Sequence, residues 1–454
     1  MYKDMTVGKP LKSILSFFVP MLFSTLFQQL YNVTDMVIVG RFISKDAFAA
    51  VGATSSTNWM ITSFIIGFVT GASVLISREF GNKSKRGVKS NIVNGIFVVA
   101  IVGVTITVLA AVFMNGILHL LRIPAEIYGL TYTYFITIVL GYPVSIALNF
   151  IDSVMRAFGD SKSSMTRGII STFVNITMDL LFVIVFRLGV FGVAIATVTA
   201  QVISLCIALA MYVHNYPEYC LKKEDFTLSR RIIGKTFSIG LPMGLQSSIT
   251  AIGCTIMQSA VNSLGTNYVA AYSSASKIQV LITTPISSLT TSLTPFVAQN
   301  YGAGKHERIF KGARSVFIIV LVYGIVGSLC QFFLGKYLGL MYLKSTETAT
   351  LSLLDYYCKI CGPFYIILSL LYFIRAYIQS LGQTVFTAIG GVVELMTRLV
   401  ISLTLVNSFG FTIICFSEPI AWMLTTSYLF AAYFIFVRKK IKLLGVHQHD
   451  EQLE

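Results

Sequence analysis

Charged residues are scarce in this chain. Asp, Glu, Lys and Arg make up only 12% of its 454 residues, whereas 55% are hydrophobic. The mean hydropathy is +0.77. A water-soluble fold could not bury so much apolar surface, so the composition excludes a soluble protein and predicts a membrane protein.

Residue clusters that mark an enzyme are also missing. We find no metalloprotease, nucleophile-elbow or complete phosphate-loop motif. Cys358 and Cys361 offer only two metal ligands, and most of the seven cysteines lie within apolar runs, which argues against a disulfide framework. The histidines all fall in predicted loops or the tail: His119, His214, His306, His447 and His449. The sequence therefore predicts neither an enzyme nor a bound cofactor or structural metal.

What the chain does have is a series of long apolar runs. About 20 residues of helix cross a bilayer core of about 30 Å, and the sequence contains twelve such runs, so we expect twelve transmembrane helices. The first run is too long for the core of a signal peptide and has no small-residue cleavage site, so we expect it to be retained. The runs lie at 13–39, 47–76, 91–118, 128–151, 168–186, 190–213, 234–262, 267–298, 315–334, 351–374, 386–406 and 411–437.

The basic residues are distributed unevenly between the two sets of alternating loops. Of the 34 Lys and Arg residues, 25 lie in the terminal segments and the loops on their side, and six lie in the other loops. This bias predicts that both termini are cytoplasmic, in a prokaryotic plasma membrane. The formal charge of +15 is therefore explained by loops that face an anionic leaflet, and no nucleic-acid partner is expected.

The chain also repeats itself with a spacing of about 222 residues. Pro20 falls on Pro242, the turn at Gly159 falls near Gly382, and Gly189 falls near Gly410. Each half holds an even number of predicted helices, so the halves should share one orientation, related by a pseudo-two-fold axis along the membrane normal. We therefore expect an all-α integral membrane protein with two six-helix lobes. The predicted boundaries are an N-lobe at 1–213, a cytoplasmic linker at 214–233, a C-lobe at 234–440 and a cytoplasmic tail at 441–454.

Two acidic residues stand inside apolar runs of the first half. Asp35 lies in the first run and Asp179 in the fifth, and Asn175 precedes Asp179 by one helical turn. From the outer helix ends, Asp35, Asp179 and Thr197 should lie about 7 to 12 Å deep, and Asn175 about 18 Å deep. A charge at bilayer depth costs several kcal/mol unless it faces protein or water, so this group predicts a functional site.

Paired carboxylates in a low-dielectric site require a counter-cation. We expect Asp35 and Asp179 to take up a proton or to bind Na⁺ through their oxygens, with Asn175 and Thr197 beside them. Alternatively, each acid only hydrogen-bonds its neighbours and stiffens the lobe. Pro20 removes a backbone hydrogen bond from the first helix and permits a bend there, although a static kink is the other interpretation.

The second half lacks matching acids. The positions that correspond to Asp35 and Asp179 are Met257 and Ser402. Glu394 and Arg398 are one turn apart on a helix, which predicts an ion pair. The sequence leaves open whether Glu418 and Lys277 line a cavity.

These features resemble the multidrug and toxic compound extrusion (MATE) family over essentially the whole chain. The resemblance rests on Asp35 before Gly40-Arg41, the Arg156-Ala-Phe-Gly-Asp160 turn, the run from Gly189 to Thr197, and the internal repeat. It implies a V-shaped pair of lobes that exports cationic or amphipathic compounds in exchange for H⁺ or Na⁺. The group Asp35, Asn175, Asp179 and Thr197 resembles the cation site of the DinF-like branch, and Pro20 resembles its bending position. The seventh run carries no acid of the NorM-like kind, which argues against a second-lobe ion site.

The resemblance leaves a second function open, that of a lipid-linked glycan flippase of the same superfamily. The phosphate-bearing substrate of a flippase would require more arginine within the membrane than this sequence has. For an exporter we expect a monomer and a substrate cavity lined by methionine, aromatic and amide side chains, with packing as the alternative role of each methionine. The candidates are Gln28, Tyr31, Met60, Met243, Gln246 and Met257.

Overall fold

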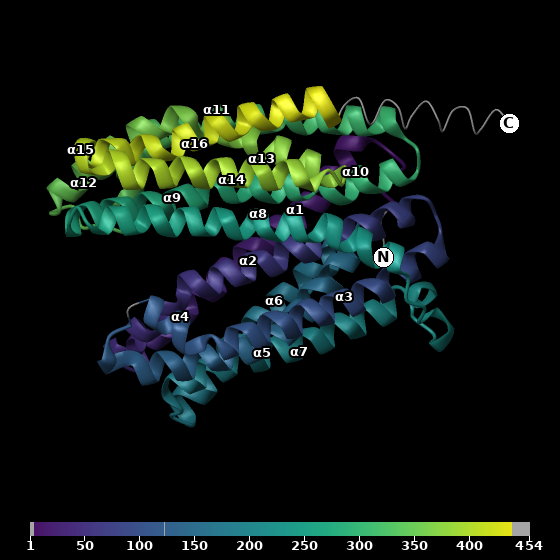
Figure 1. Cartoon of the computed structure of the whole chain (residues 1–454), viewed down its shortest axis with the longest axis horizontal. Coiled ribbons are helices and arrows are strands. Elements are labelled where there is room, and N and C mark those ends of the chain that lie inside the picture. Colours follow the sequence, from purple (N-terminus) through teal and green to yellow (C-terminus); the bar gives the residue numbers. More distant parts are fainter. Residues whose placement is uncertain (1–3, 122, 438–454) are drawn as a thin grey trace. The chain divides into compact units, whose positions relative to one another are not determined.

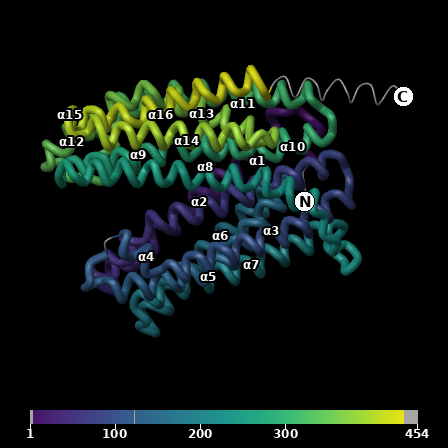
Figure 2. The backbone as a smooth tube through the Cα atoms, in the orientation of Figure 1, coloured from purple at the N-terminus to yellow at the C-terminus, as the bar shows by residue number. Residues whose placement is uncertain are grey.

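A computed structural model of the chain describes residues 4–121 and 123–437, so the predicted tail at 441–454 lies outside the described residues. The regular elements within these ranges are all helical. Twelve of the helical segments are long and apolar enough to cross a membrane, as the sequence predicted. The structure thus confirms the all-α membrane class, and Figures 1 and 2 trace the helices along the chain.

The described chain divides into two compact units, one of which holds Ser16–Gly244 and the residues up to Met5. In this first unit α5 packs against α2, α3 and α7, and α6 packs against α7. Its helices are α1 (Pro10–Phe42), α2 (Lys45–Gly81), α3 (Lys85–Val112), α4 (Met114–Leu120), α5 (Ala125–Ala157), α6 (Ser161–Leu180), α7 (Gly189–Asn215) and the first part of α8 (Arg230–Asn262).

The second unit holds the described residues from Leu245 to Val437 and the short segment Thr6–Leu15. Within it α11 packs against α13, and α14 packs against α16, as Figure 1 also shows. Its helices are the rest of α8, α9 (Thr266–Thr291), α10 (Leu293–Gly302), α11 (His306–Gly339), α12 (Thr348–Cys361), α13 (Tyr365–Ser380), α14 (Thr384–Val400), α15 (Val406–Phe409) and α16 (Phe411–Ala432).

Most helices extend beyond the apolar runs that predicted them. The loop expected between the apolar runs at 47–76 and 91–118 shrinks to three residues, because α2 ends at Gly81 and α3 begins at Lys85. The Ser84 hydroxyl caps α3 by accepting a hydrogen bond from the Gly87 amide at 3.0 Å. Hydropathy marks only the part of a helix that lies in hydrocarbon, whereas capped, charged ends continue the helix into the interface.

Backbone conformation repeats between the two units. In the first unit, α6 follows the turn at Gly159 and ends in a π-helical turn at Leu181–Val185. In the second unit, α14 follows the turn at Gly382 and ends in a π-helical turn at Ile401–Leu405. Gly159 and Gly382 both have positive φ, 76° and 68°, a conformation that glycine adopts without steric cost. The other matched positive-φ residues are Lys83 with Gly304, and Gly189 with Gly410.

The segment that precedes α8 is attached to α3. The Asn94 side chain, which is fully buried, accepts a hydrogen bond from the Ser229 amide at 2.8 Å and donates one to the Thr227 carbonyl at 3.2 Å. Lys89 pairs with Asp225 at 3.0 Å. The backbone amide of Lys222 and the Lys89 ammonium hold the pKa of Asp225 below its usual range. The start of α8 is therefore fixed against the start of α3.

A close backbone approach between α2 and α8 in the first unit gives a testable prediction. A Cβ added at Gly71 would lie 2.6 Å from Cα of Gly240, a backbone atom that cannot move aside cheaply. We expect Gly71→Ala to destabilise the protein by about 1 to 3 kcal/mol, measured as a lower unfolding temperature in detergent. Gly52→Ala in the same helix is the control, because a Cβ at Gly52 meets no atom within 4 Å. Equal stability of the two variants would show that this contact is not tight.

Candidate functional site

The acidic and amide side chains that the sequence singled out lie together in the first unit. With its nitrogen facing the acids, the Asn175 amide donates to Asp35 Oδ1 at 2.8 Å and to Asp179 Oδ2 at 3.2 Å. The Asp35 and Asp179 carboxyl groups are within hydrogen-bonding reach of each other. Helices α1 and α6 thus bring two carboxyl groups to one amide.

Tyr31 and Thr197 complete this cluster. The Tyr31 hydroxyl lies within hydrogen-bonding reach of the Asp35 carboxyl group and of the Thr197 side chain. Thr197 also donates to the carbonyl of Val193 in its own helix, α7, at 3.1 Å. The cluster therefore joins α1, α6 and α7. We call these five residues, Tyr31, Asp35, Asn175, Asp179 and Thr197, the acid cluster.

The acid cluster is well shielded on its α6 side. Asp179 is 0% exposed and Asn175 is 1% exposed, whereas Asp35 is half-buried. Asp179 Oδ1 is buried with no hydrogen-bond donor among the described residues. Two ionised carboxylates cannot donate to each other, and a buried oxygen without a donor is rare enough in a folded protein to require an explanation.

Local packing explains how three helices reach this cluster. About one helical turn before Asn175, the Thr172 hydroxyl of α6 contacts the Phe27 carbonyl of α1 at 3.4 Å. Beside it, the Ser204 hydroxyl of α7 donates a hydrogen bond to the Ser171 hydroxyl of α6 at 2.7 Å. The π-helical turn at Leu181–Val185 begins two residues after Asp179. Such turns change the helix phase and are frequent at functional sites.

An apolar cluster packs one turn away from the acids. Its members are Ile38, Val39, Ala47, Val51, Val183, Val190 and Val193. Because this side lacks polar groups, it keeps the local dielectric constant low and strengthens every charge interaction at the acids. Tyr134 of α5 packs on the same cluster and neighbours both acids.

Sequence reasoning assigned Tyr31 only to the substrate cavity and did not identify Tyr134. The available signal for Tyr31 was its spacing of one helical turn from Asp35, which places both on one face of α1. Tyr134 carried no such signal, because α5 holds several aromatic residues and only the packing of α5 against the site selects one of them.

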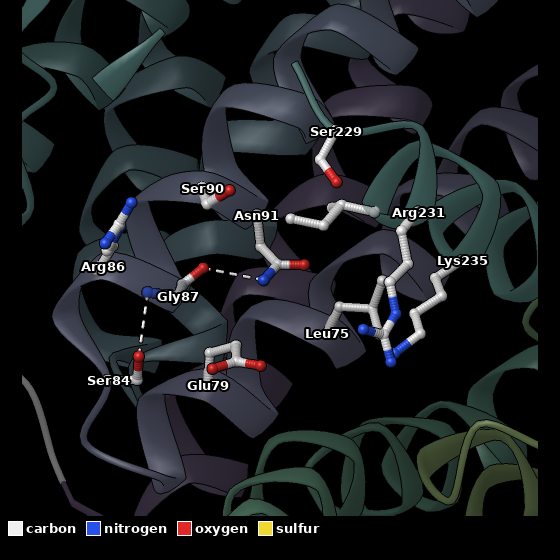
Figure 3. Close-up of a pocket in the computed structure, with 11 residues that line it drawn as sticks. Leu75, Glu79, Ser84, Arg86, Gly87, Ser90, Asn91, Ser229, Arg231 and Lys235 are labelled. Atoms are coloured by element: carbon white, nitrogen blue, oxygen red, sulfur yellow. Dashed lines mark hydrogen bonds between the residues drawn. The ribbon is translucent and has the colours of Figure 1, made fainter. Parts of the chain in front are cut away.

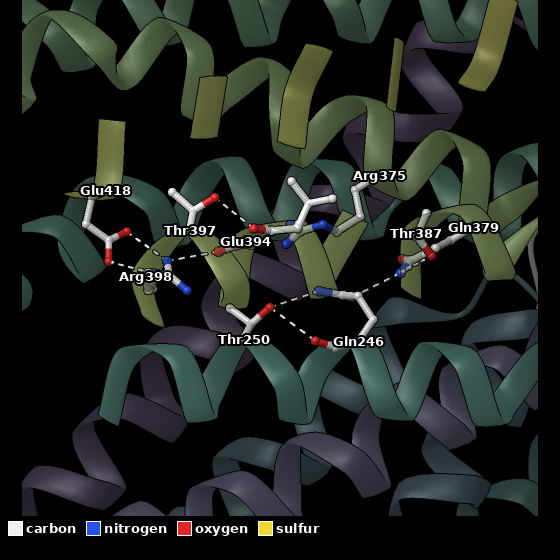
Figure 4. A network of polar contacts seen from close by, with 10 residues as sticks. Gln246, Thr250, Arg375, Gln379, Thr387, Glu394, Thr397, Arg398 and Glu418 are labelled. Atoms are coloured by element: carbon white, nitrogen blue, oxygen red, sulfur yellow. Dashed lines mark hydrogen bonds and ion pairs between the residues drawn. The ribbon is translucent and has the colours of Figure 1, made fainter. Parts of the chain in front are cut away.

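The second unit contains a buried network of charges instead (Figure 4). Glu394 of α14 pairs with Arg375 of α13 at 2.7 Å and with Arg398 one turn along its own helix at 2.9 Å. Arg398 also binds both carboxylate oxygens of Glu418 in α16, at 3.1 and 2.9 Å. The predicted Glu394–Arg398 pair is therefore present, and Arg375 and Glu418 extend it into a neutral chain of four charges.

This network occupies the repeat-equivalent place of the acid cluster. Arg398 follows Gly382 by sixteen residues, as Asn175 follows Gly159. Glu418 follows Gly410 by eight residues, as Thr197 follows Gly189. Where the first unit has an amide and a hydroxyl beside two acids, the second unit has a guanidinium that is 2% exposed. A built-in cation, Arg398, thus stands where the first unit has the neutral amide of Asn175 beside Asp35 and Asp179.

The candidate cavity residues are spread over both units. Gln28 is exposed, and Tyr31 and Met60 are half-buried, in the first unit. Met243 is buried there, and Met257 is buried in the second unit, where Gln246 accepts a hydrogen bond from Gln379 at 3.2 Å. Neither unit by itself brings this set together, and the cavity remains a prediction. Lys277, which the sequence left open, lies over the Tyr342 ring at 5.1 Å.

Comparison with known proteins agrees with this architecture. The MatE family profile matches the chain twice, at residues 20–181 and 242–404. The multidrug resistance protein YpnP of Bacillus subtilis, described as probable, is 26% identical over 84% of each chain. The FAD transporter of Shewanella oneidensis is 22% identical over 78% of this chain and 80% of its own. A multidrug resistance MATE family transporter of the MOP superfamily, solved in an outward-facing conformation, superposes with a TM-score of 0.86 at 22% identity, over 97% and 98% of the two chains.

Twelve apolar helices in a doubled unit, with ionisable groups held inside each unit, define a multi-pass membrane transporter rather than an enzyme. The paired profile matches make the assignment specific. The chain belongs to the MATE family of multidrug efflux transporters, and its bacterial relatives place it in a plasma membrane.

Proposed function

We propose that this protein is a secondary antiporter that exports cationic or amphipathic organic compounds in exchange for H⁺ or Na⁺, as a monomer with both termini in the cytoplasm. The observation that carries the proposal is the acid cluster. Asp35 and Asp179 share one amide donor, and Asp179 keeps a buried oxygen without a donor among the described residues. A proton between the carboxyl groups, or a Na⁺ ion bound by oxygens, would remove the repulsion of two adjacent negative charges.

The charge network of the second unit supports the placement of coupling in the first unit. Glu394 and Glu418 are neutralised by Arg375 and Arg398, which are part of the chain. Those carboxylates therefore have no need of a transported cation. Asp35 and Asp179 of the first unit have no Lys or Arg ion-pair partner among the described residues, so a cation from solution can change their net charge.

We infer that α1 transmits this change of charge. Asp35 and Tyr31 both belong to α1, so loading the acid cluster alters how α1 is held against α6 and α7. Pro20 lies within the same helix and contributes no amide donor to it. A helix with a missing backbone hydrogen bond bends at low cost. Release of the organic substrate would then accompany uptake of the ion at the outer side.

The substrate class rests on the relatives. Several of them are named as multidrug resistance or multidrug export proteins, and one is named as an FAD transporter. We favour organic cations, because the exchanged charge is positive and the first unit carries buried acids. The flippase alternative is not favoured, because the buried Arg398 is already bound by two glutamates and offers no open site for a phosphate-bearing lipid.

Efflux from proteoliposomes tests the proposal. We expect export of a fluorescent organic cation to accelerate under an imposed pH gradient, or under an imposed Na⁺ gradient, when each is applied alone. A tenfold ion gradient is worth about 1.4 kcal/mol, so one-for-one exchange would concentrate the substrate up to about tenfold. An export rate that neither gradient changes would refute antiport. If one gradient accelerates export, that gradient identifies the coupling ion.

A further inference from the structure

A basic pocket opens beside the helix ends of the first unit, away from the acid cluster. It has a volume of about 510 Å³ and lies between the end of α2, the start of α3 and the start of α8 (Figure 3). Three cationic side chains line it, Arg86, Arg231 and Lys235, against one acid, Glu79. The pocket therefore has a net charge of +2, and nothing in antiport explains that charge.

The cations of the pocket outnumber its one acid, Glu79. Arg86, Arg231 and Lys235 form no ion pair within the ranges 4–121 and 123–437. Arg231 and Lys235 are one helical turn apart on α8, an arrangement of like charges that destabilises a helix unless an anion lies between them. Glu79 lies against the α3 backbone, since a Cβ at Gly87 would come within 2.2 Å of its Oε2 atom.

Hydrogen bonds hold the walls of the pocket in place. Asn94 of α3, fully buried, holds the residues just before α8 through hydrogen bonds to Thr227 and Ser229. This fixes Arg231 and Lys235 opposite the first turns of α3. The Asn91 side chain is held in turn by the Gly87 carbonyl at 2.8 Å. The start of α3 adds the positive end of a helix dipole, which favours an anion.

The lining is amphipathic. Leu75, six residues before the end of α2, and Ile232 contribute apolar surface, whereas Ser90 and Ser229 contribute hydroxyl groups. All of these residues lie within about two helical turns of the end of a membrane-spanning helix, or directly precede one. Because the ends of membrane-spanning helices reach the interfacial region, we expect this pocket to lie at the level of the lipid headgroups. Basic pockets between helix ends are typical sites for anionic headgroups.

We propose that this pocket binds the phosphate headgroup of an anionic phospholipid, with Arg231 and Lys235 as its main ligands and Arg86 at the rim. The lipid would neutralise the pocket and join α2, α3 and α8 at one membrane surface. The proposal is independent of the coupling ion and of the exported substrate.

Native mass spectrometry of the full-length protein in detergent tests this site. The probes are phosphatidylglycerol, phosphatidylcholine with the same acyl chains, and free glycerol phosphate. We expect phosphatidylglycerol to be retained preferentially. Each basic residue near an anionic headgroup contributes about fivefold in affinity, so Arg231→Gln/Lys235→Gln should weaken phosphatidylglycerol binding roughly 25-fold.

The matched control is Lys162→Gln/Lys223→Gln, which removes the same charge from exposed positions outside the pocket. It should bind phosphatidylglycerol as the wild type does. If the pocket double variant does not fold, Arg86→Gln is used, with an expected loss of about fivefold. Unchanged lipid binding in the pocket variants, or an equal loss in the control, would overturn the proposal. Glycerol phosphate that binds as tightly as the lipid would assign the site to a soluble phosphate compound.

Discussion

Export by Asp179→Asn should no longer respond to the ion gradient that drives the wild type. Asparagine keeps the size of the side chain, but it cannot carry the negative charge that holds a proton or Na⁺. Where the wild type concentrates a fluorescent cation up to about tenfold under a tenfold gradient, we expect the variant to reach only the level of passive equilibration. Proteoliposome efflux with the gradient imposed and then collapsed measures the difference.

Asp35→Asn should have the same effect, because Asn175 joins both acids in one cluster. The Asp35→Asn/Asp179→Asn double variant should therefore be no worse than either single variant, which is the non-additive behaviour of residues that act as a unit. Asp46→Asn is the control, since Asp46 is an exposed residue in the first turn of α2. Gradient-driven export in both single variants would remove the acid cluster from the mechanism while leaving the fold assignment intact.

Arg398→Met should be the most destabilising single substitution in the second unit. Met has similar length, but its loss of charge would leave Glu418, which is 4% exposed, without a cationic partner among the described residues. Removing one partner from a buried ion pair costs about 3 to 5 kcal/mol. Thermal unfolding in detergent would detect this loss.

Two further variants separate this effect from a simple loss of packing. Arg398→Met/Glu418→Gln removes the orphaned charge and should recover part of the lost stability. Lys359→Met breaks a half-exposed ion pair with Asp355 one turn away, and such pairs contribute only about 0.3 to 0.5 kcal/mol. If Arg398→Met is as stable as Lys359→Met, the buried network does not hold α14 against α16.

The two charged clusters show how a duplicated lobe can divide its roles. Both lobes keep the same backbone plan, including the π-helical turns after Asp179 and after Arg398. Only the side chains at equivalent places differ. Arg375 and Arg398 make the second cluster neutral, whereas in the mechanism we propose the first cluster takes its counter-cation from solution. The net charge of the cluster in the first lobe can therefore change when an ion binds, whereas the net charge of the cluster in the second lobe stays at zero.

The sequence by itself determined the class, the number of membrane crossings and the duplication. These follow from local chemistry, because apolar runs of sufficient length must be helices in a bilayer, and turns that need positive φ recur at the same spacing. The sequence also selected Asp35 and Asp179, since an acid inside an apolar run stands out without any knowledge of its neighbours.

Only the tertiary structure decided which groups those acids contact. The Asn175 bridge and the Tyr31–Thr197 contact join α1, α6 and α7, and the pairing of Arg398 with Glu418 joins helices α14 and α16. Helix periodicity reports which face of a single helix a residue occupies, but it does not report which helix packs against that face. The partners of a buried charge are therefore set by the packing of helices, and the sequence pattern of each helix alone leaves them open.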